Sequence, residues 1–182
     1  MTERPVSGRT EIIRPDLTLK DRAMRKVFRG LYRGFGLASS LTSIRVRGAL
    51  AAVHVDGHLL ILRNSYGRWF TLPGGRVSAG ESHHDGAVRE LREETGIRVD
   101  ATAMMLAHAE VRTWRKRTED LEFWRIDLPE RPAIRLDPVE IGEARWMRPE
   151  EIWRMPLYPP FRRYLTTVFD PQEPAPAPPR EP

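Results

Sequence analysis

Three glutamates crowd a single turn of a predicted helix, and this crowding constrains the chain more than any other feature. Glu90, Glu93 and Glu94 follow a glycine-rich segment. Like charges three or four residues apart on a helix repel by a few tenths of a kcal/mol per pair, so a helix needed only for stability would avoid them. A hard divalent cation reverses this cost, because Mg²⁺ is held by carboxylate oxygens together with substrate phosphates. The local pattern therefore indicates a metal-assisted phosphate site.

The residues around the glutamates define where this helix begins and ends. Ser82 is suited to cap its N-terminus, the helix is expected to run to about Thr95, and Gly96 stands where a left-handed residue closes a helix. At about 100° per residue the three glutamates share one third of the helix surface, whereas Ala87 and Leu91 occupy a side that can face a core. The alternative is an ordinary charged helix whose acidic face is solvated.

The segment 75–97 resembles the Nudix box, G-x5-E-x7-R-E-U-x-E-E-x-G-U, in which U is a bulky apolar residue. Every defined position of the motif is matched by Gly75, Glu81, Arg89, Glu90, Leu91, Glu93, Glu94, Gly96 and Ile97. The resemblance continues in the preceding sequence WFTLPGG and in the later sequence EARW, and it covers about residues 45–169. It implies an α/β structure, the Nudix fold, in which a mixed β-sheet is sandwiched between α-helices.

The resemblance also implies an activity. Nudix hydrolases are Mg²⁺-dependent pyrophosphohydrolases, in which Mn²⁺ can substitute, and they cleave a nucleoside diphosphate linked to a moiety X by attack of water on phosphorus. The metal neutralises the diphosphate and lowers the pKa of water. The expected partner is thus a small nucleotide-like diphosphate. Dimers are frequent in the family, so the resemblance also allows a homodimer.

Six residues receive roles from the resemblance, and the general base is left open. Glu90 and Glu94 would be the main metal ligands, and Glu93 would bind metal or orient water. The Gly75 carbonyl oxygen would complete the coordination shell of the metal. Arg89 would position Glu93, and Glu81 would brace the loop. A general base is expected outside the motif. Glu140 and Glu143 are the candidates and Glu110 is a weaker one, while each could equally be an exposed surface acid.

A rival reading is a catalytically silent Nudix-like domain that binds a nucleotide or RNA. Such a domain has no reason to retain three crowded acids, which favours the enzyme. A catalytically silent domain would bind its ligand without turnover, and this binding would depend little on Mg²⁺.

Composition limits the class of protein. The 182 residues suit one domain with flanks, and there is no cysteine, which excludes disulfide scaffolds, thiolate zinc sites and cysteine nucleophiles. No apolar run approaches the roughly 20 residues of a membrane span, and the N-terminus lacks the apolar region of a signal peptide. We therefore expect a cytoplasmic protein.

The basic charge is concentrated in an N-terminal flank, residues 1–44. Residues 1–48 hold 11 Lys and Arg against 4 Asp and Glu. Within them, residues 21–37 place apolar side chains at helical spacing between arginines, which predicts a short basic amphipathic helix. We favour docking of its apolar stripe on the domain over binding to nucleic acid or lipid and over disorder. Nucleic acid is thus an unlikely partner, and deletion of the flank is expected mainly to affect stability or solubility.

The rest of the chain reads as a Nudix domain, residues 45–169, and a proline-rich disordered tail, residues 170–182. Strands are expected at 46–55, 58–63, 69–72, 104–112, 121–128 and 144–147, with a hairpin turn at Asp56-Gly57 and helices opening at Pro149 and over 161–169. The polar segment 113–120 is expected to be a turn.

Several other polar or aromatic residues are candidates for a functional role. The adjacent His83 and His84 point about 100° apart on a helix, so a shared metal ion is not expected and exposed side chains are favoured. His108 is expected to be packed or hydrogen-bonded. Trp114 could stack on a base. A basic loop could grip phosphates or simply be solvated, and it consists of Arg112, Arg115, Lys116 and Arg117.

Overall fold

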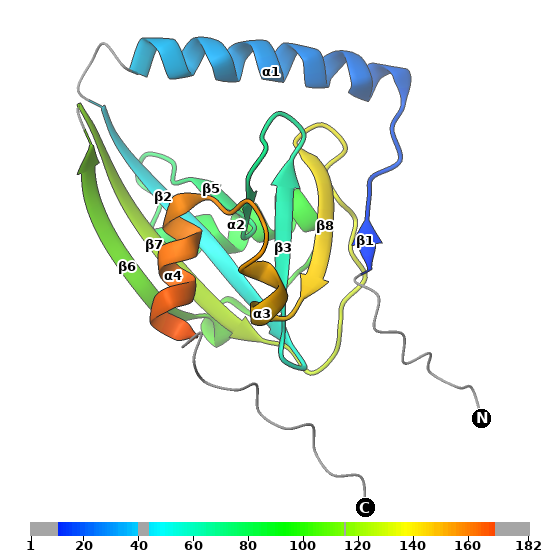
Figure 1. Ribbon diagram of the computed structural model, residues 1–182, viewed down its shortest axis with the longest axis vertical. Helices are drawn as coiled ribbons and strands as arrows, with labels where there is room; N and C mark the ends of the chain where they lie inside the picture. The colour runs from blue at the N-terminus through cyan, green and yellow to red at the C-terminus, as the bar shows by residue number, and fades with distance from the viewer. Residues whose placement is uncertain (1–10, 40–43, 115, 170–182) are drawn as a thin grey trace, which may run out of the picture.

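The structure is a computed structural model that describes residues 11–39, 44–114 and 116–169, with the side chains of residues 29, 31–39, 44 and 114 left out. Eight strands form one mixed sheet in this part of the chain, in the order β1-β8-β3-β2-β7-β6, with β4 beside β3 and β5 beside β2 (Figure 1). The strands are β1 (Ile12–Ile13), β2 (Ile44–Val55), β3 (His58–Asn64), β4 (Phe70–Thr71), β5 (Gly74–Arg76), β6 (Met105–Trp114), β7 (Arg117–Asp127) and β8 (Ile141–Met147).

Strand β2 forms the centre of the sheet and is buried on both faces. It pairs in parallel with β7 and antiparallel with β3 and β5. Ala51 and Val53 face one hydrophobic cluster, whereas Leu50 and Ala52 face the other. Because both faces are covered, the strand reads as a continuous apolar run rather than as an alternation of apolar and polar residues.

Helices cover the two faces of the sheet (Figure 1). Helix α2 (His83–Thr95) packs on one face through Ala87 and Leu91, both fully buried. Helices α3 (Pro149–Ile152) and α4 (Pro159–Val168) cover the other, where Phe161 and Tyr164 are fully buried. The short 3₁₀ helix η1 (Ala101–Ala103) follows α2. The predicted fold class, a mixed sheet between helices, is confirmed.

Two local predictions agree with the backbone. Asp56 and Gly57 both have positive φ, at 48° and 70°, as a tight turn between β2 and β3 requires. Ser82 caps α2 by accepting a hydrogen bond from the amide of Asp85, and Gly96 ends the helix with φ 74°.

The whole polar segment 113–120 was expected to be a turn, but among its described residues only Lys116 is a turn and the rest belong to strands. Strands β6 and β7 continue into the segment, with Thr113 opposite Thr118. Several of its polar side chains are paired across strands: Asp120 accepts from Arg45 of β2 at 3.1 Å, and the hydroxyls of Thr113 and Thr118 lie 3.0 Å apart. Arg117 pairs along its own strand with Glu119 at 2.9 Å. Cross-strand polar pairs stabilise exposed strand ends, so a polar sequence does not exclude a strand.

The N-terminal flank forms a helix, as predicted, together with a strand that the sequence did not indicate. Helix α1 (Leu19–Ser39) crosses over one end of the sheet, and β1 pairs antiparallel with β8 (Figure 1). Of the described side chains in the apolar stripe, Met24 and Val27 are 41% and 53% exposed and Phe28 is half-buried, so docking of the whole stripe stays a prediction. Arg25 makes contact with backbone oxygens before and at the start of β8. The predicted tail, residues 170–182, lies outside the described residues.

Among the described residues, no helix combines the length and the apolar character that crossing a membrane requires.

Gly74 is the glycine on which the close approach of β5 to β2 depends. A Cβ there would lie 2.3 Å from the carbonyl oxygen of Ala49, and its φ is 154°. We predict that Gly74→Ala destabilises the fold by about 3 kcal/mol or more. Gly80→Ala is the matched control, since Gly80 has φ 80° but open space around it, and left-handed strain alone costs about 1–2 kcal/mol. Urea unfolding measures the free energy of unfolding of both variants. Equal losses of stability in the two would contradict the explanation by steric clash at Gly74.

Candidate active site

A cleft of about 450 Å³ opens beside α2 and is lined almost entirely by acidic groups. Its lining residues are Arg89, Glu90, Glu93, Glu94, Asp137 and Glu140. The first four come from α2 and the last two from the segment before β8. The two segments are joined through their backbones, because the amide of Asp137 donates to the Glu94 carbonyl oxygen at 3.0 Å. The three predicted box glutamates therefore line one cavity, although half of the Glu93 side chain remains exposed to solvent.

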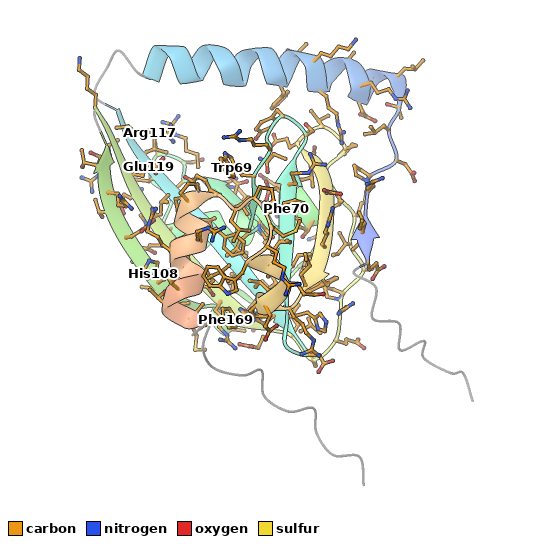
Figure 2. All side chains as sticks on the ribbon, in the orientation of Figure 1. Trp69, Phe70, His108, Arg117, Glu119 and Phe169 are labelled. Atoms are coloured by element: carbon orange, nitrogen blue, oxygen red, sulfur yellow. The ribbon has the colours of Figure 1, made fainter. Side chains whose placement is uncertain are left out.

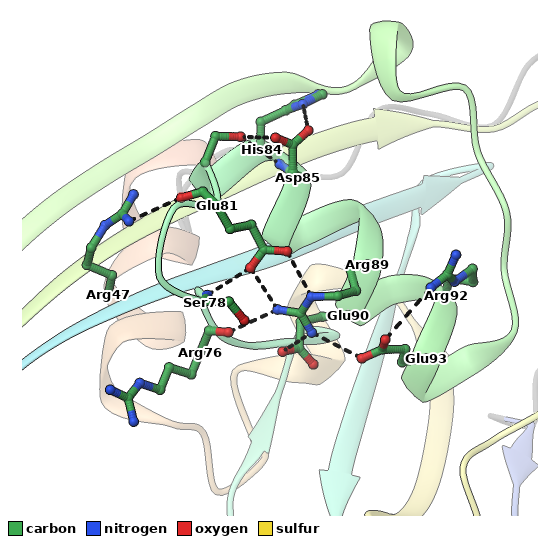
Figure 3. A network of polar contacts seen from close by, with 11 residues as sticks. Arg47, Arg76, Ser78, Glu81, His84, Asp85, Arg89, Glu90, Arg92 and Glu93 are labelled. Atoms are coloured by element: carbon green, nitrogen blue, oxygen red, sulfur yellow. Dashed lines mark hydrogen bonds and ion pairs between the residues drawn. The ribbon is translucent and has the colours of Figure 1, made fainter.

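Arg89 is the centre of the polar network in Figure 3. It binds both carboxylate oxygens of Glu81, at 2.8 and 3.0 Å, and it donates to Glu90 at 2.8 Å and to Glu93 at 3.0 Å. A fifth hydrogen bond reaches the carbonyl oxygen of Arg76 at 3.0 Å. The guanidinium thus holds three carboxylates and ties α2 to β5, and the contact between Arg89 and Glu93 is the one that the sequence predicted.

Glu81 links this network to the loop between β5 and α2. Besides Arg89, its carboxylate accepts the amide of Ser78 at 2.8 Å. The hydrogen bonds from Arg89, followed by the one from Ser78, lower the pKa of Glu81 to about 2. Glu81 is therefore ionised across the physiological range and fixes the loop against the helix.

Glu94 is the most deeply buried of the cleft acids, with 5% of its surface exposed. One carboxylate oxygen accepts the amide of Gly74 at 2.8 Å. Burial raises the pKa of Glu94 well above its usual value, and the nearby Glu90, Glu140 and Asp137 raise it further, against the opposing effect of the Gly74 hydrogen bond. A buried acid of this kind gains from a cation that replaces its proton.

Glu90 lies against the backbone of β5. A Cβ on Gly75 would stand 2.6 Å from a Glu90 oxygen, so the glycine leaves room for the carboxylate. Burial raises the pKa of Glu90, although the hydrogen bond and charge of Arg89 oppose the rise. Gly75 itself is not among the residues that line the cleft, and its carbonyl oxygen stays a ligand only by prediction.

The donor set of the cleft fits a hard divalent cation. All of its acidic groups are carboxylates, and oxygen ligands are those that Mg²⁺ prefers. Within the described part of the chain, no group of three acidic or histidine side chains is arranged so as to hold a metal ion. Mg²⁺ does not require such a group, because it keeps several waters and is bound through one or two carboxylates and substrate phosphates. Glu90 and Glu94, whose carboxyl groups are close enough to raise the pKa of Glu94, stay the predicted pair of ligands.

The structure separates the three candidate general bases. Glu140 lines the cleft, and its pKa is raised by burial and by the charges of Asp137, Glu90 and Glu93. Glu143 is 2% exposed and ion-paired with Arg63 and Arg145, which hold its pKa below the usual value despite its burial. Glu110 forms a two-pronged ion pair with Arg163 at 2.6 and 2.8 Å. Neither Glu143 nor Glu110 lines the cleft.

The two histidines at the start of α2 are partly buried, so the prediction of exposed side chains is wrong. His83 lies 3.1 Å from Arg47, and its side chain is 11% exposed. His84 lies 2.9 Å from the carbonyl oxygen of Ala101 and contacts the edge of Trp124. Their different partners agree with the expectation that they do not share a metal ion.

The other residues that the sequence suggested as functional do not line the cleft where the structure describes them. His108 packs against Phe123 and Tyr164, as expected for a packed histidine, and Figure 2 shows it beside α4. Arg117 and Glu119 lie together at the start of β7 (Figure 2). None of the described residues of the basic loop lines the cleft. The side chain of Trp114 and the whole of Arg115 fall outside the described part of the chain.

Sequence reasoning missed Asp137 and the amide of Gly74. Asp137 accepts the amides of Val139 and Glu140 at 2.7 Å each, which is the local turn that an aspartate before proline favours. The Asp-Pro pair was therefore a readable signal for a turn, and the turn brings Glu140 to the cleft. Nothing in the sequence indicated that the Gly74 amide binds Glu94.

Comparison of structures agrees with this architecture. The structure of a MutT NUDIX hydrolase from Burkholderia pseudomallei superposes with a TM-score of 0.60, covering 69% of this chain and 98% of that chain at 21% identity. At this identity the likeness shows the shared fold.

Comparison of sequences identifies the family. Nudix hydrolase 2 of Arabidopsis thaliana is 30% identical over 128 residues, which are 66% of this chain and 45% of that protein. An uncharacterized Nudix hydrolase of Pseudomonas aeruginosa is 32% identical over 138 residues, 72% of this chain and 75% of that protein. The chain thus spans less than half the length of the Arabidopsis relatives that it matches. The family model of the NUDIX domain matches residues 44–168, and the chain therefore belongs to the Nudix family.

Proposed function

We propose that the chain is a Mg²⁺-dependent pyrophosphohydrolase that cleaves a nucleoside diphosphate linked to a second moiety, with Mn²⁺ as a substitute metal. One observation carries the proposal: the box carboxylates face a single cleft together with Asp137 and Glu140. A cleft lined by so many acids repels an anionic substrate unless cations intervene. Membership of the Nudix family supports the reaction type. The absence of cysteine fits a reducing compartment, and we propose a cytoplasmic location.

The roles of the residues follow from their positions. Glu90 and Glu94 would hold the metal, and Arg89 would keep Glu93 in place beside them. When bound, the metal would neutralise the diphosphate and polarise its P–O bonds. Glu140 would take the proton of the attacking water on a carboxylate oxygen. Its raised pKa suits that task, since a base works best when its pKa lies near the working pH.

A substrate screen tests the function. Nucleoside triphosphates, nucleotide sugars, ADP-ribose, dinucleotides, NADH and coenzyme A are incubated with Mg²⁺ or Mn²⁺, and released phosphate or nucleotide is measured. The proposal expects hydrolysis of at least one of these compounds and loss of hydrolysis with a chelator. Binding of a nucleotide without turnover would instead identify the chain as a catalytically silent domain.

Glu94→Gln is predicted to lower kcat by about 100-fold or more, because it removes a ligand charge while keeping the shape of the side chain. The amide oxygen of glutamine can still accept the Gly74 hydrogen bond, so the fold is expected to persist. Steady-state kinetics with the substrate found in the screen measures the effect. A variant that turns over at the wild-type rate would remove Glu94 from the metal site.

The same variant is predicted to be more stable than the wild type without metal. An acid whose pKa is raised on folding contributes stability below its unfolded pKa, near 4.5, and loses that contribution as pH rises through the folded pKa. As pH rises above about 4.5, the metal-free wild type should therefore lose Tm more steeply than Glu94→Gln. Calorimetry can detect this, since about 1 kcal/mol moves Tm by about 2–4 °C in a chain of this size. If the Tm values of the two proteins change with pH in parallel, ionisation of Glu94 does not destabilise the metal-free fold.

Glu140→Gln is predicted to lower the catalytic rate, whereas Glu143→Gln is predicted to lower the thermal stability. Removal of a general base costs about 10²–10⁴-fold in rate, so Glu140→Gln should lower kcat on that scale with little change in Tm. Glu143→Gln should lower Tm, because it weakens a buried ion-pair cluster, while kcat stays close to wild type. Kinetics and thermal melting of both variants decide the assignment, which fails if the two phenotypes are exchanged.

A further inference from the structure

The segment 137–141, which we call the acidic loop, places Asp137 and Glu140 in the cleft through an unusual number of backbone contacts. Within the loop, Asp137 accepts the amides of Val139 and Glu140, and its own carbonyl oxygen accepts the amide of Ile141 at 3.1 Å. The remaining carbonyl oxygens of the loop point to donors from elsewhere in the chain. The loop is therefore held from within by the Asp137 carboxylate and from outside by contacts to its backbone carbonyl oxygens.

Ser65, which follows β3, binds two of these carbonyl oxygens. Its hydroxyl donates to Val139 at 2.6 Å, and its amide donates to Glu140 at 2.7 Å. Ser65 lies in the part of the chain that the family model matches. The middle of the acidic loop is thus fixed from within the Nudix domain.

Arg25 binds the carbonyl oxygens on either side of that middle. Its Nε donates to Pro138 at 2.8 Å and its Nη2 donates to Ile141 at 2.6 Å, across more than a hundred residues of sequence. A guanidinium has a rigid fork of donors, so it can fix two acceptors in one relative position. Arg25 belongs to α1, which lies outside the matched residues 44–168. Figure 1 shows α1 crossing the end of the molecule where the acidic loop leads into β8.

The charges of the cleft explain why the acidic loop needs such an anchor. Asp137 and Glu140 face Glu90 and Glu93 across the same cavity, and like charges repel. Without a backbone anchor, this repulsion favours movement of the loop away from α2. An error of about 1 Å in the position of a reacting group can cost about 10²-fold in rate.

We propose that Arg25 is a positioning residue that holds Asp137 and Glu140 at the cleft, which makes α1 a working part of the catalytic unit. The inference rests on the proposed function for its catalytic consequence. It also departs from the sequence-based expectation that the N-terminal flank mainly affects stability or solubility. Among the basic side chains of α1 that the structure describes, Arg25 is the one that contacts the loop, whereas Arg22 and Lys26 are exposed.

The test compares full-length Arg25→Ala, Arg25→Lys and Arg22→Ala with the wild type. Arg22→Ala is the matched control, since it removes the same charge from an exposed position of α1. Two readouts are taken: hydrogen exchange of the peptide that covers the acidic loop, without metal or substrate, and steady-state kinetics with the substrate from the screen.

The expected result is faster exchange in Arg25→Ala than in Arg22→Ala, with kcat lowered about tenfold or more. KM should stay within about twofold, because ground-state binding by the metal site is retained. Arg25→Lys should restore part of kcat, since an ammonium group can reach one of the two carbonyl oxygens. If the Arg25→Ala protein does not fold, Arg25→Lys is the deciding variant.

The proposal is overturned if either loop exchange or kcat of Arg25→Ala equals that of Arg22→Ala. It is also overturned if KM rises while kcat stays constant, because that would place Arg25 in substrate binding. A wild-type chain that hydrolyses no compound in the screen defeats the proposed function and the catalytic part of this inference together. An active wild type with unchanged loop exchange in Arg25→Ala defeats this inference alone.

Discussion

The contact of Arg89 with three carboxylates is the interaction on which the site depends. Glu81, Glu90 and Glu93 would repel one another on a short loop and helix, and the guanidinium between them turns that repulsion into a set of ion pairs. The same side chain binds the backbone of Arg76 and so ties α2 to β5. The box helix can therefore carry its acids at a cleft and still pack Ala87 and Leu91 into the core.

The other cleft acids are not compensated in this way. Glu94 and Glu140 keep raised pKa values because burial and neighbouring acids disfavour their ionised forms. Such a cluster lowers the stability of the metal-free fold, and a folded protein retains it where a ligand supplies the missing charge. Glu143 differs from Glu94, because it is about as deeply buried but is ion-paired with Arg63 and Arg145. An acid paired with arginines serves the fold, whereas an unpaired acid at a cleft is available for a cation.

Much of the fold and part of the site could be predicted from the sequence. The ends of α2, its buried face and the turn at Asp56-Gly57 follow from local rules for caps, periodicity and glycine. The strand ends at 113–120 could not be predicted, because polar contacts such as Arg45 with Asp120 and Thr113 with Thr118 exist only in the assembled sheet. The same limit applies to the general base. Glu140 and Glu143 look alike in sequence, and only the three-dimensional positions of Arg63 and Asp137 separate a half-buried acid at the cleft from a buried ion pair. The contact of Arg25 with the acidic loop spans more than a hundred residues, and no local rule reaches that far.

The central claim, that acids of one helix hold a divalent cation beside a diphosphate, is tested most directly by binding of Mn²⁺. Electron paramagnetic resonance counts bound Mn²⁺ during titration of the wild type and of a Glu90→Gln/Glu94→Gln double variant, each with a non-hydrolysable methylene diphosphonate present. The account predicts that the wild type binds Mn²⁺ and that the double variant, still folded, loses this binding. Equal binding by the two proteins would contradict it.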